Sequence, residues 1–193
     1  MQFYDDEKVA LFISGPSIFA TAKAIGFDLD YKRLLTHFRH QCQLVRALYY
    51  TAIADDQEFS SIQPLVDWLE YNGFTLVTKP TKTFRDSSGR LKYKGNMSVE
   101  LAVDALRLAP ALDHIVLFSG DGDYRALVEA LQEDGLRVTV VSTLETQSSM
   151  IADELRRQAD QFIDLADLEH LVSRDKSHGR RTDLQTSRST TVA

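Results

Sequence analysis

The sequence predicts a three-layer α/β domain built around a mostly parallel sheet of five to six strands. Short apolar runs alternate along the chain with longer segments whose apolar residues recur every three or four positions, which is the period of a helix. The runs at 9–13 and 114–118 are almost entirely apolar, as expected of strands that helices cover on both faces. The connections between these segments are short, which favours parallel strands joined by helices.

Local helix signals set the boundaries in the first half of the chain. Pro16 suits the first turn of a helix that begins directly after the first strand. Asp30 can cap a second helix, and Gly73 ends a third. The strands and helices expected from these signals span residues 9–13, 17–25, 31–40, 44–51, 61–71 and 75–78.

The second half continues the alternation. Pro110 ends a helix that begins near residue 98, and Gly135 ends the helix that follows the fourth strand. From Ser173 onward the chain is polar and without periodicity, so we expect one domain over residues 1–172 and a disordered tail over 173–193. The remaining elements are expected at 98–108, 114–118, 125–135, 138–141, 151–159, 162–165 (a short strand or a turn) and 165–172 (a last helix).

Composition restricts the class of protein. The chain has 193 residues, of which 44% are apolar and 26% charged, as in an ordinary soluble domain. The single cysteine, Cys42, excludes an internal disulfide and a zinc site built from cysteines, and it is compatible with a reducing compartment. No apolar run approaches the length of a membrane span, and the acidic residues 1–7 do not resemble a secretory signal. We therefore expect a cytoplasmic protein that has no membrane partner.

Basic side chains gather in one segment of an otherwise acidic chain. The net charge of −6 argues against general affinity for nucleic acids, but residues 79–94 hold six basic side chains against one acidic one. This segment predicts contacts with phosphate groups. A solvated hairpin is the alternative, because residues 86–89 have the composition of a turn. The six basic residues are Lys79, Lys82, Arg85, Arg90, Lys92 and Lys94.

Two carboxylates follow the strand at 114–118. Asp121 and Asp123 lie in a glycine-rich turn at the carboxyl end of this strand, where open α/β sheets hold their ligand sites. Carboxylates this close repel each other, and a divalent cation offsets the repulsion. The alternative is structural: Asp123 caps the next helix, and Asp121 is solvated. The turn alone does not decide between a metal site and a helix cap.

Other polar side chains are expected to border the same cleft. Ser14 and Ser17 follow the first strand, whose carboxyl end can neighbour that of the strand at 114–118. Ser98 begins the next helix, in which Asp104 occupies an apolar stretch and therefore needs a polar partner. A metal ion or the backbone donors of a neighbouring turn would satisfy Asp104.

The helices at 31–40 and 61–71 carry side chains that need no functional explanation. His37 and His40 have no cysteine or acidic residue near them in the sequence, so both are expected on the surface. Trp68 and Tyr71 are expected to pack in the core and at its edge.

The chain resembles NYN domains of the PIN-like ribonuclease superfamily, in a bacterial branch related to DUF88 proteins. The resemblance covers about residues 8–170 and implies a PIN-like, Rossmann-like arrangement of the sheet. The turn sequence SGDGD, preceded by Lys-Gly and a helical Asp, is its most specific part. The motifs that carry the resemblance are KGNM at 94–97, VELAVD at 99–104, FSGDGDY at 118–124 and ADELRRQADQFI at 152–163.

The resemblance implies metal-dependent cleavage of RNA. In such a reaction carboxylates hold Mg²⁺ or Mn²⁺, which lowers the pKa of a bound water and neutralises charge on the phosphate. Asp121 and Asp123 would be the main metal ligands, and Asp104 a further ligand or a residue that orients one. The basic segment 79–94 would hold the RNA backbone.

This chain departs from the family pattern at three positions. Ser14 and Ser98 stand where the family usually has Asp, and Ser17 where it usually has Asn. A hydroxyl is a much poorer ligand for magnesium than a carboxylate. We therefore expect impaired cleavage; the competing explanation is a metal ion held by Asp104, Asp121 and Asp123 with slow turnover. The alternatives are a non-catalytic RNA-binding or regulatory protein that uses the same cleft, and a protein-interaction module; association of the chain with itself is left open.

Overall fold

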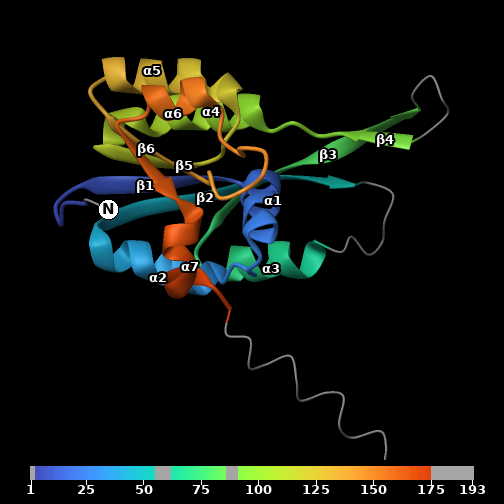
Figure 1. Ribbon diagram of the computed structural model, residues 1–193. Helices are drawn as coiled ribbons and strands as arrows, with labels where there is room; N and C mark the ends of the chain where they lie inside the picture. Colours follow the sequence, from blue (N-terminus) through green and yellow to red (C-terminus); the bar gives the residue numbers. More distant parts are fainter. Residues whose placement is uncertain (1–2, 55–61, 86–90, 175–193) are drawn as a thin grey trace, which may run out of the picture.

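The computed structural model describes residues 3–54, 62–85 and 91–174, except for the side chains of residues 54, 82–85 and 91–94. Seven strands form one sheet in the order β4-β3-β2-β1-β5-β6-β7 (Figure 1). All neighbouring strands are parallel except β4, which runs antiparallel to β3. The predicted mostly parallel sheet is thus confirmed. The strands are β1 (Lys8–Ser14), β2 (Gln43–Ala54), β3 (Thr75–Arg85), β4 (Leu91–Lys94), β5 (His114–Phe118), β6 (Arg137–Ser142) and β7 (Gln161–Asp164).

The edge of the sheet differs from the sequence prediction. β3 was expected to end at Thr78, but it continues to Arg85 and pairs with β4, with Lys82 opposite Lys94. Much of the basic segment is therefore a β-hairpin. Its strands carry lysines and arginines at many positions and lack a clear apolar alternation, which is why the sequence did not reveal β4.

Helices cover both faces of the sheet, as predicted. In Figure 1, α1, α2, α3 and α7 lie below the sheet, and α4, α5 and α6 lie above it. The expected last helix is divided into a 3₁₀ turn and the short helix α7. The helices are α1 (Gly15–Ile25), α2 (Tyr31–Gln41), α3 (Gln63–Tyr71), α4 (Ser98–Leu108), α5 (Arg125–Glu133), α6 (Asp153–Gln158) and α7 (Glu169–Val172), with 3₁₀ turns at Ala109–Ala111, Gly122–Tyr124 and Leu165–Leu168.

The helix boundaries follow from local chemistry. The Asp30 carboxylate accepts hydrogen bonds from the backbone N–H groups of Lys32 and Arg33, at 2.9 and 3.0 Å, and so caps α2 as expected. Gly73 and Gly135 have φ angles of 90° and 88°, in the left-handed region that favours glycine, and each lies just beyond a helix end.

Two apolar cores lie on the two faces of the sheet, and β1 contributes to both. Leu11 and Ile13 pack with the side chains of α1 and α2, whereas Ala10 and Phe12 pack with those of α4 and α5. Residues 9–13 are completely buried, which explains the unbroken apolar run.

Within the described residues, no helix has the length and apolarity required to cross a membrane.

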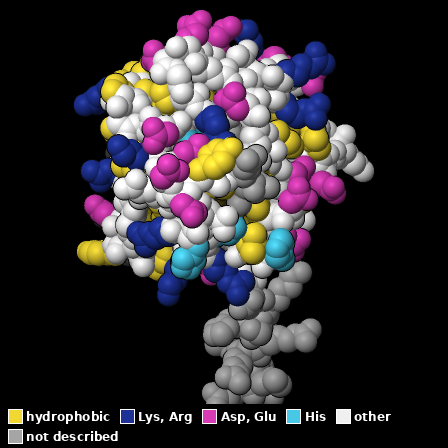
Figure 2. Space-filling model, turned by 90° about the vertical axis from the view of Figure 1, so that its left-hand side faces the viewer, with side chains coloured by type: hydrophobic (Ala, Val, Ile, Leu, Met, Phe, Trp, Pro, Cys, Tyr) yellow, Lys and Arg dark blue, Asp and Glu magenta, His cyan; other side chains and the backbone are white. Residues whose placement is uncertain are grey.

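The strand order makes the carboxyl ends of β1 and β5 a switch point of the sheet, where open α/β folds form a ligand crevice. β1 pairs with β2 on one side and with β5 on the other, so the chain connections diverge at this point. Open α/β sheets hold ligands at such switch points. Figure 2 shows the molecule from the left-hand side of Figure 1, where acidic and basic side chains are interspersed over the surface.

Candidate nucleic-acid site

Three serine hydroxyls meet where β1 and β5 end. The Oγ atoms of Ser14 and Ser17 are 2.9 Å apart, and the Oγ atoms of Ser17 and Ser119 are 3.5 Å apart. Ser119 is almost fully buried, whereas the other two are half-buried. The expected approach of the turn after β1 to the segment after β5 is seen between Ser17 and Ser119. Ser119 was not singled out, although it directly precedes the Gly-Asp turn.

The first turn of α1 opens on this serine cluster. Ser14 occupies the N-cap position but makes no capping hydrogen bond through its side chain, and the first turn contains no acidic residue. The positive end of the α1 dipole therefore lies at the serine cluster, and no carboxylate in the first turn of α1 offsets this positive charge. Gly15 is required here because a Cβ atom would lie 2.6 Å from the Tyr49 ring.

The Gly-Asp turn forms a 3₁₀ turn before α5 begins. Asp121 is its N-cap, and the Asp121 Oδ1 atom accepts a hydrogen bond from the Asp123 N–H group at 3.1 Å. Ser119 Oγ accepts a further hydrogen bond from the Asp121 N–H group at 3.2 Å. The cap that we considered for Asp123 is therefore made by Asp121. Both carboxylates remain exposed to solvent.

The segment after β6 holds this turn in place. A Cβ atom on Gly120 would overlap the backbone carbonyl oxygen of Met150, and the Ala152 N–H group donates to the Gly120 carbonyl at 2.9 Å. The Glu154 carboxylate lies so close to Gly122 that a Cβ atom there would be 2.5 Å from Glu154 Oε1. Sequence analysis did not identify Met150 or Glu154 as neighbours of the site, because no local pattern reports a contact across 30 residues.

Asp104 finds its polar partners within the protein. The Tyr50 hydroxyl donates to Asp104 Oδ2 at 3.2 Å, and Arg107 Nη1 lies 3.6 Å from Asp104 Oδ1. Burial and the neighbouring Asp104 carboxylate raise the pKa of the Tyr50 hydroxyl, so this group stays protonated and remains a donor. The predicted need for a partner is met by these two side chains.

Ser98 connects the start of α4 to the Gly-Asp turn. Asn96 Oδ1 accepts hydrogen bonds from the Ser98 N–H and hydroxyl groups, at 2.6 and 2.5 Å. Burial raises the pKa of the Tyr124 hydroxyl, a hydrogen bond with Ser98 lowers it, and the carboxylates of Asp121 and Asp123 raise it. Ser98, Asp123 and Tyr124 also line one groove between α4 and α5.

The carboxylates do not fit the metal site that the resemblance implied. Among the described residues, no group of three or more His, Cys, Asp or Glu side chains is arranged to hold a metal ion. Asp104 is engaged by Tyr50 and Arg107, and Asp121 caps the 3₁₀ turn. A serine hydroxyl at position 14 or 98 is also a poorer ligand for Mg²⁺ or Mn²⁺ than a carboxylate.

The basic segment is described in part. Lys79 Nζ forms an ion pair with Glu100, at 2.8 Å to Oε1 and 2.9 Å to Oε2, so a neighbouring carboxylate offsets its charge. The hydrogen bond from Lys79 is the main cause of a lowered pKa at Glu100. The other predicted phosphate contacts have side chains outside the described residues: Lys82, Arg85, Arg90, Lys92 and Lys94.

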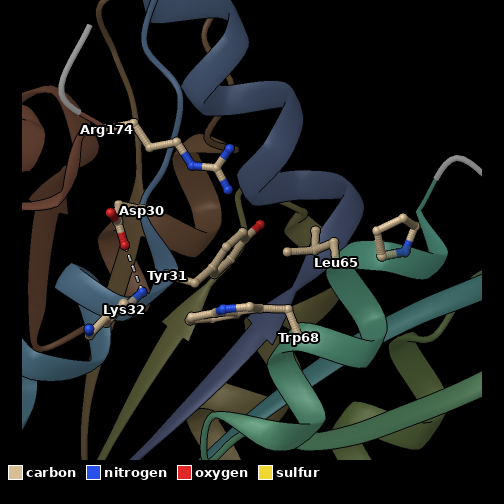
Figure 3. Close-up of a pocket in the computed structure, with 7 residues that line it drawn as sticks. Asp30, Tyr31, Lys32, Leu65, Trp68 and Arg174 are labelled. Atoms are coloured by element: carbon tan, nitrogen blue, oxygen red, sulfur yellow. Dashed lines mark hydrogen bonds between the residues drawn. The ribbon is translucent and has the colours of Figure 1, made fainter. Parts of the chain in front are cut away.

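A separate pocket lies below the sheet, between α2 and α3. Its volume is about 550 Å³, and the side chains of Tyr31, Trp68 and Arg174 converge on it (Figure 3). Trp68 also packs against the lower core, as expected. This pocket is lined by residues of the opposite layer from α4 and α5, so it is separate from the groove that Ser98, Asp123 and Tyr124 line.

Two expectations for α2 and α3 need correction. Tyr71 is 87% exposed and does not pack at the edge of the core. His37 is half-buried rather than on the surface, and its Nε2 atom is buried without a hydrogen-bond partner among the described residues. His40 is exposed, as expected. The helical period predicts which face of α2 is buried, but it does not predict how deeply a side chain at the border of that face is covered.

Comparison with known proteins identifies the family. Residues 8–173 match the model of the NYN domain. The chain is 35% identical over 171 residues to the low amplitude and bright protein LabA of Synechococcus elongatus (strain ATCC 33912 / PCC 7942 / FACHB-805), covering 86% of this chain and 88% of LabA. A solved protein of unknown function from Vibrio parahaemolyticus RIMD 2210633 is 26% identical, with a TM-score of 0.69, over 89% of this chain and 99% of that one. The resemblance seen in the sequence motifs is confirmed: this chain belongs to the NYN domain family.

Proposed function

We propose that this NYN-domain chain binds RNA in the crevice at the carboxyl ends of β1 and β5, and that it cleaves RNA weakly or not at all. The observation that carries the proposal is the serine cluster of Ser14, Ser17 and Ser119 at the open N-terminus of α1. Two of its members, Ser14 and Ser17, are neutral hydrogen-bond donors at positions where the family resemblance implies metal-binding side chains.

The serine cluster suits a phosphate group of the RNA backbone. Hydroxyl groups donate hydrogen bonds to phosphate oxygens, and the free N–H groups at a helix N-terminus attract anions. A carboxylate at position 14 would repel phosphate unless a metal ion neutralised it. The serine at this position removes that repulsion, so RNA binding here does not require a metal.

The same substitutions are expected to impair cleavage. When bound, a metal ion would supply an activated water and would neutralise charge on the phosphate. The described carboxylates do not assemble a group that fits such an ion. Asp104 holds Tyr50 in place instead, while Asp121 and Asp123 shape the turn beside the serine cluster. Binding without efficient turnover is therefore the function that this geometry supports.

The basic segment would extend the RNA-binding surface. Five of its six basic residues lie on strands of the sheet that also contains β1 and β5: Lys79, Lys82 and Arg85 on β3, and Lys92 and Lys94 on β4. Lys79 contributes little net charge, because Glu100 pairs with it. The remaining five basic residues would carry most of the non-specific attraction to the RNA backbone.

The test compares RNA binding and RNA cleavage by the same protein samples. Fluorescence anisotropy with a labelled single-stranded RNA measures affinity in EDTA, Mg²⁺ and Mn²⁺, and a gel measures cleavage. We expect metal-independent binding by the wild type and little cleavage, whereas Ser14→Asp/Ser98→Asp gains metal-dependent cleavage and loses metal-free binding. Thr36→Asp, an exposed change on α2, controls for added negative charge.

Two outcomes would contradict the proposal. Absence of RNA binding by the wild type under all three conditions would refute the RNA-binding function and would favour a protein-interaction module. Equal metal-dependent cleavage by the wild type and the double variant would show that the serines do not limit catalysis. Calorimetric titration with Mn²⁺ adds a readout independent of cleavage: we expect tighter binding by the double variant than by the wild type.

A further inference from the structure

Two adjoining pockets form one groove on the lower layer of the sheet, which we call the aromatic groove. The first is the pocket between α2 and α3 described above, of about 550 Å³, and the second, of about 410 Å³, lies beside α1. Tyr31, Leu65 and Arg174 line both pockets, so the two are continuous. Pockets of this size, lined by aromatic and apolar side chains with a few polar groups, are typical of ligand sites.

Each pocket presents its own aromatic ring. Trp68 of α3 lines the first pocket, and Phe19 of α1 lines the second. Phe19 is 62% exposed, and Trp68 is half-buried with no hydrogen-bond partner for its indole N–H among the described residues. Tyr31 is buried, and its hydroxyl oxygen lies 3.3 Å from that of Tyr49, so its ring is a fixed part of both linings. Accessible aromatic rings of this kind are stacking surfaces for nucleobases.

Arg174 lies between the two rings. It is a lining residue of both pockets, and Figure 3 shows its guanidinium directed towards Tyr31. The backbone around it is held in place: the Arg174 N–H group donates to the Asp28 carbonyl at 2.9 Å, and Arg33 Nη1 donates to the Ser173 carbonyl at 2.7 Å. The Arg174 guanidinium has no hydrogen bond or ion pair with another described residue, so its donors are available to a ligand.

The charge of the lining favours an anion. Three cationic side chains and two acidic ones line the two pockets, although the net charge of the chain is −6. The Asp30 carboxylate is one of the two acidic groups, and it is already engaged by the backbone N–H groups of Lys32 and Arg33. The cationic residues are Lys23, Lys32 and Arg174, and the other acidic residue is Asp28.

We propose that the aromatic groove binds two successive nucleotides of single-stranded RNA. One base stacks on Trp68, the next stacks on Phe19, and the phosphodiester between them pairs with Arg174. The order ring, cation, ring along the groove matches the order base, phosphate, base along the strand, and only unpaired bases are free to stack in this way. A proline-rich peptide also packs on aromatic grooves, but it has no anion for Arg174. This site lies outside the crevice at β1 and β5, and neither site requires the other.

Trp68 reports on the groove directly, because it is the single tryptophan of the chain. Its fluorescence is followed during titrations in EDTA with adenosine, AMP, the dinucleotide ApA and a ten-residue oligoadenylate of about this minimal chemistry. We expect saturable quenching, with ApA binding about tenfold more tightly than AMP because a second base is stacked. The oligoadenylate should bind several-fold more tightly than ApA, since further phosphates are attracted to the lysines of the lining.

Two variants test the roles of the cation and of the second ring. Arg174→Gln should weaken ApA binding about tenfold and leave adenosine binding unchanged, because only ApA carries a phosphate. Arg107→Gln, which removes an exposed arginine from α4 in the opposite layer, is its matched control. Phe19→Ala should reduce the affinity for ApA to that for AMP, whereas Tyr71→Ala removes an exposed ring outside both linings and should change neither affinity. Thermal unfolding checks that every variant is folded.

Several results would overturn the proposal. These are no saturable quenching by ApA or oligoadenylate, equal losses in Arg174→Gln and Arg107→Gln, or quenching by a proline-rich peptide that ApA does not compete away. Tighter binding of ApA than of oligoadenylate would assign the groove to a free dinucleotide instead of an RNA strand. Ser14→Asp/Ser98→Asp, which alters the crevice, should leave the ApA titration of Trp68 unchanged; a parallel loss would place the ligand in the crevice and not in this groove.

Discussion

The Tyr50 hydroxyl donates a hydrogen bond to Asp104 between β2 and α4, with 3.2 Å between Tyr50 Oη and Asp104 Oδ2. Asp104 is a candidate metal ligand in the family motif, but here the buried Tyr50 supplies the hydrogen bond that its carboxylate needs. The carboxylate is 25% exposed, so it is neither isolated in the core nor fully solvated. Its position is explained without a metal ion.

The first prediction concerns this pair. Tyr50→Phe should lower the free energy of unfolding by about 1 kcal/mol or slightly more, because the hydrogen bond has a charged acceptor. In an Asp104→Asn background the same change should cost less, since the acceptor is neutral. Urea unfolding of the four proteins in EDTA completes the cycle. A strictly additive cycle would show that the pair makes no energetic contribution.

The second prediction concerns the glycines of the turn. Gly120→Ala should destabilise the protein by about 1–3 kcal/mol, because its Cβ atom meets the rigid carbonyl of Met150. Gly122→Ala should cost less, since the atom that it meets is the end of the Glu154 side chain, which can rotate away. Thermal unfolding compares the two variants directly. A larger loss for Gly122→Ala would contradict this account of the turn.

The sequence predicted the parts of the structure that local patterns encode. Residues 9–13 are apolar because both faces of β1 are covered, and this burial is what an unbroken run reports. The meeting of Ser17 with Ser119, directly after β5, followed from the rules for parallel sheets. The partner of Asp104 could not be predicted, because Tyr50 is 54 residues away and its own strand reads as ordinary buried sequence.

The third prediction is a loss of stability in acid caused by His114. This side chain is fully buried, and burial, followed by the neighbouring Arg137, lowers the pKa of His114 below its ordinary value. Arg137 Nη2 lies 3.0 Å from Nδ1, and Thr139 Oγ1 lies 2.8 Å from Nε2, so the neutral ring is well accommodated. The folded state then binds fewer protons than the unfolded state.

The free energy of unfolding should therefore be fully retained above the ordinary histidine pKa of about 6.5 and should fall as the pH drops below it. His37, whose pKa is also lowered mainly by burial, acts in the same direction. Urea unfolding at a series of pH values measures the slope. His114→Gln should reduce it, and an unchanged slope in that variant would exclude His114 as the source.

The last prediction uses the ion pair at the edge of the proposed RNA surface. Glu100 accepts two hydrogen bonds from Lys79, at 2.8 and 2.9 Å, so the Glu100 carboxylate offsets the positive charge of Lys79. Glu100→Gln should release Lys79 and strengthen RNA binding several-fold at low salt, while Lys79→Gln alone should weaken binding only slightly. Glu129→Gln removes the same charge from an ion pair on α5 and serves as the control.

Anisotropy titrations over a range of salt concentrations separate this effect from a change in fold. Lys92→Glu/Lys94→Glu should reduce both the affinity and its dependence on salt, since fewer phosphates would be neutralised. Glu100→Gln should increase the salt dependence of RNA affinity, because the Lys79 ammonium group becomes available to neutralise one more phosphate. If the Lys92→Glu/Lys94→Glu change leaves affinity unaltered across the salt range, the basic segment does not contact the RNA backbone. If Glu100→Gln and Glu129→Gln strengthen binding equally, the gain comes from net charge alone and Lys79 has no specific part in it.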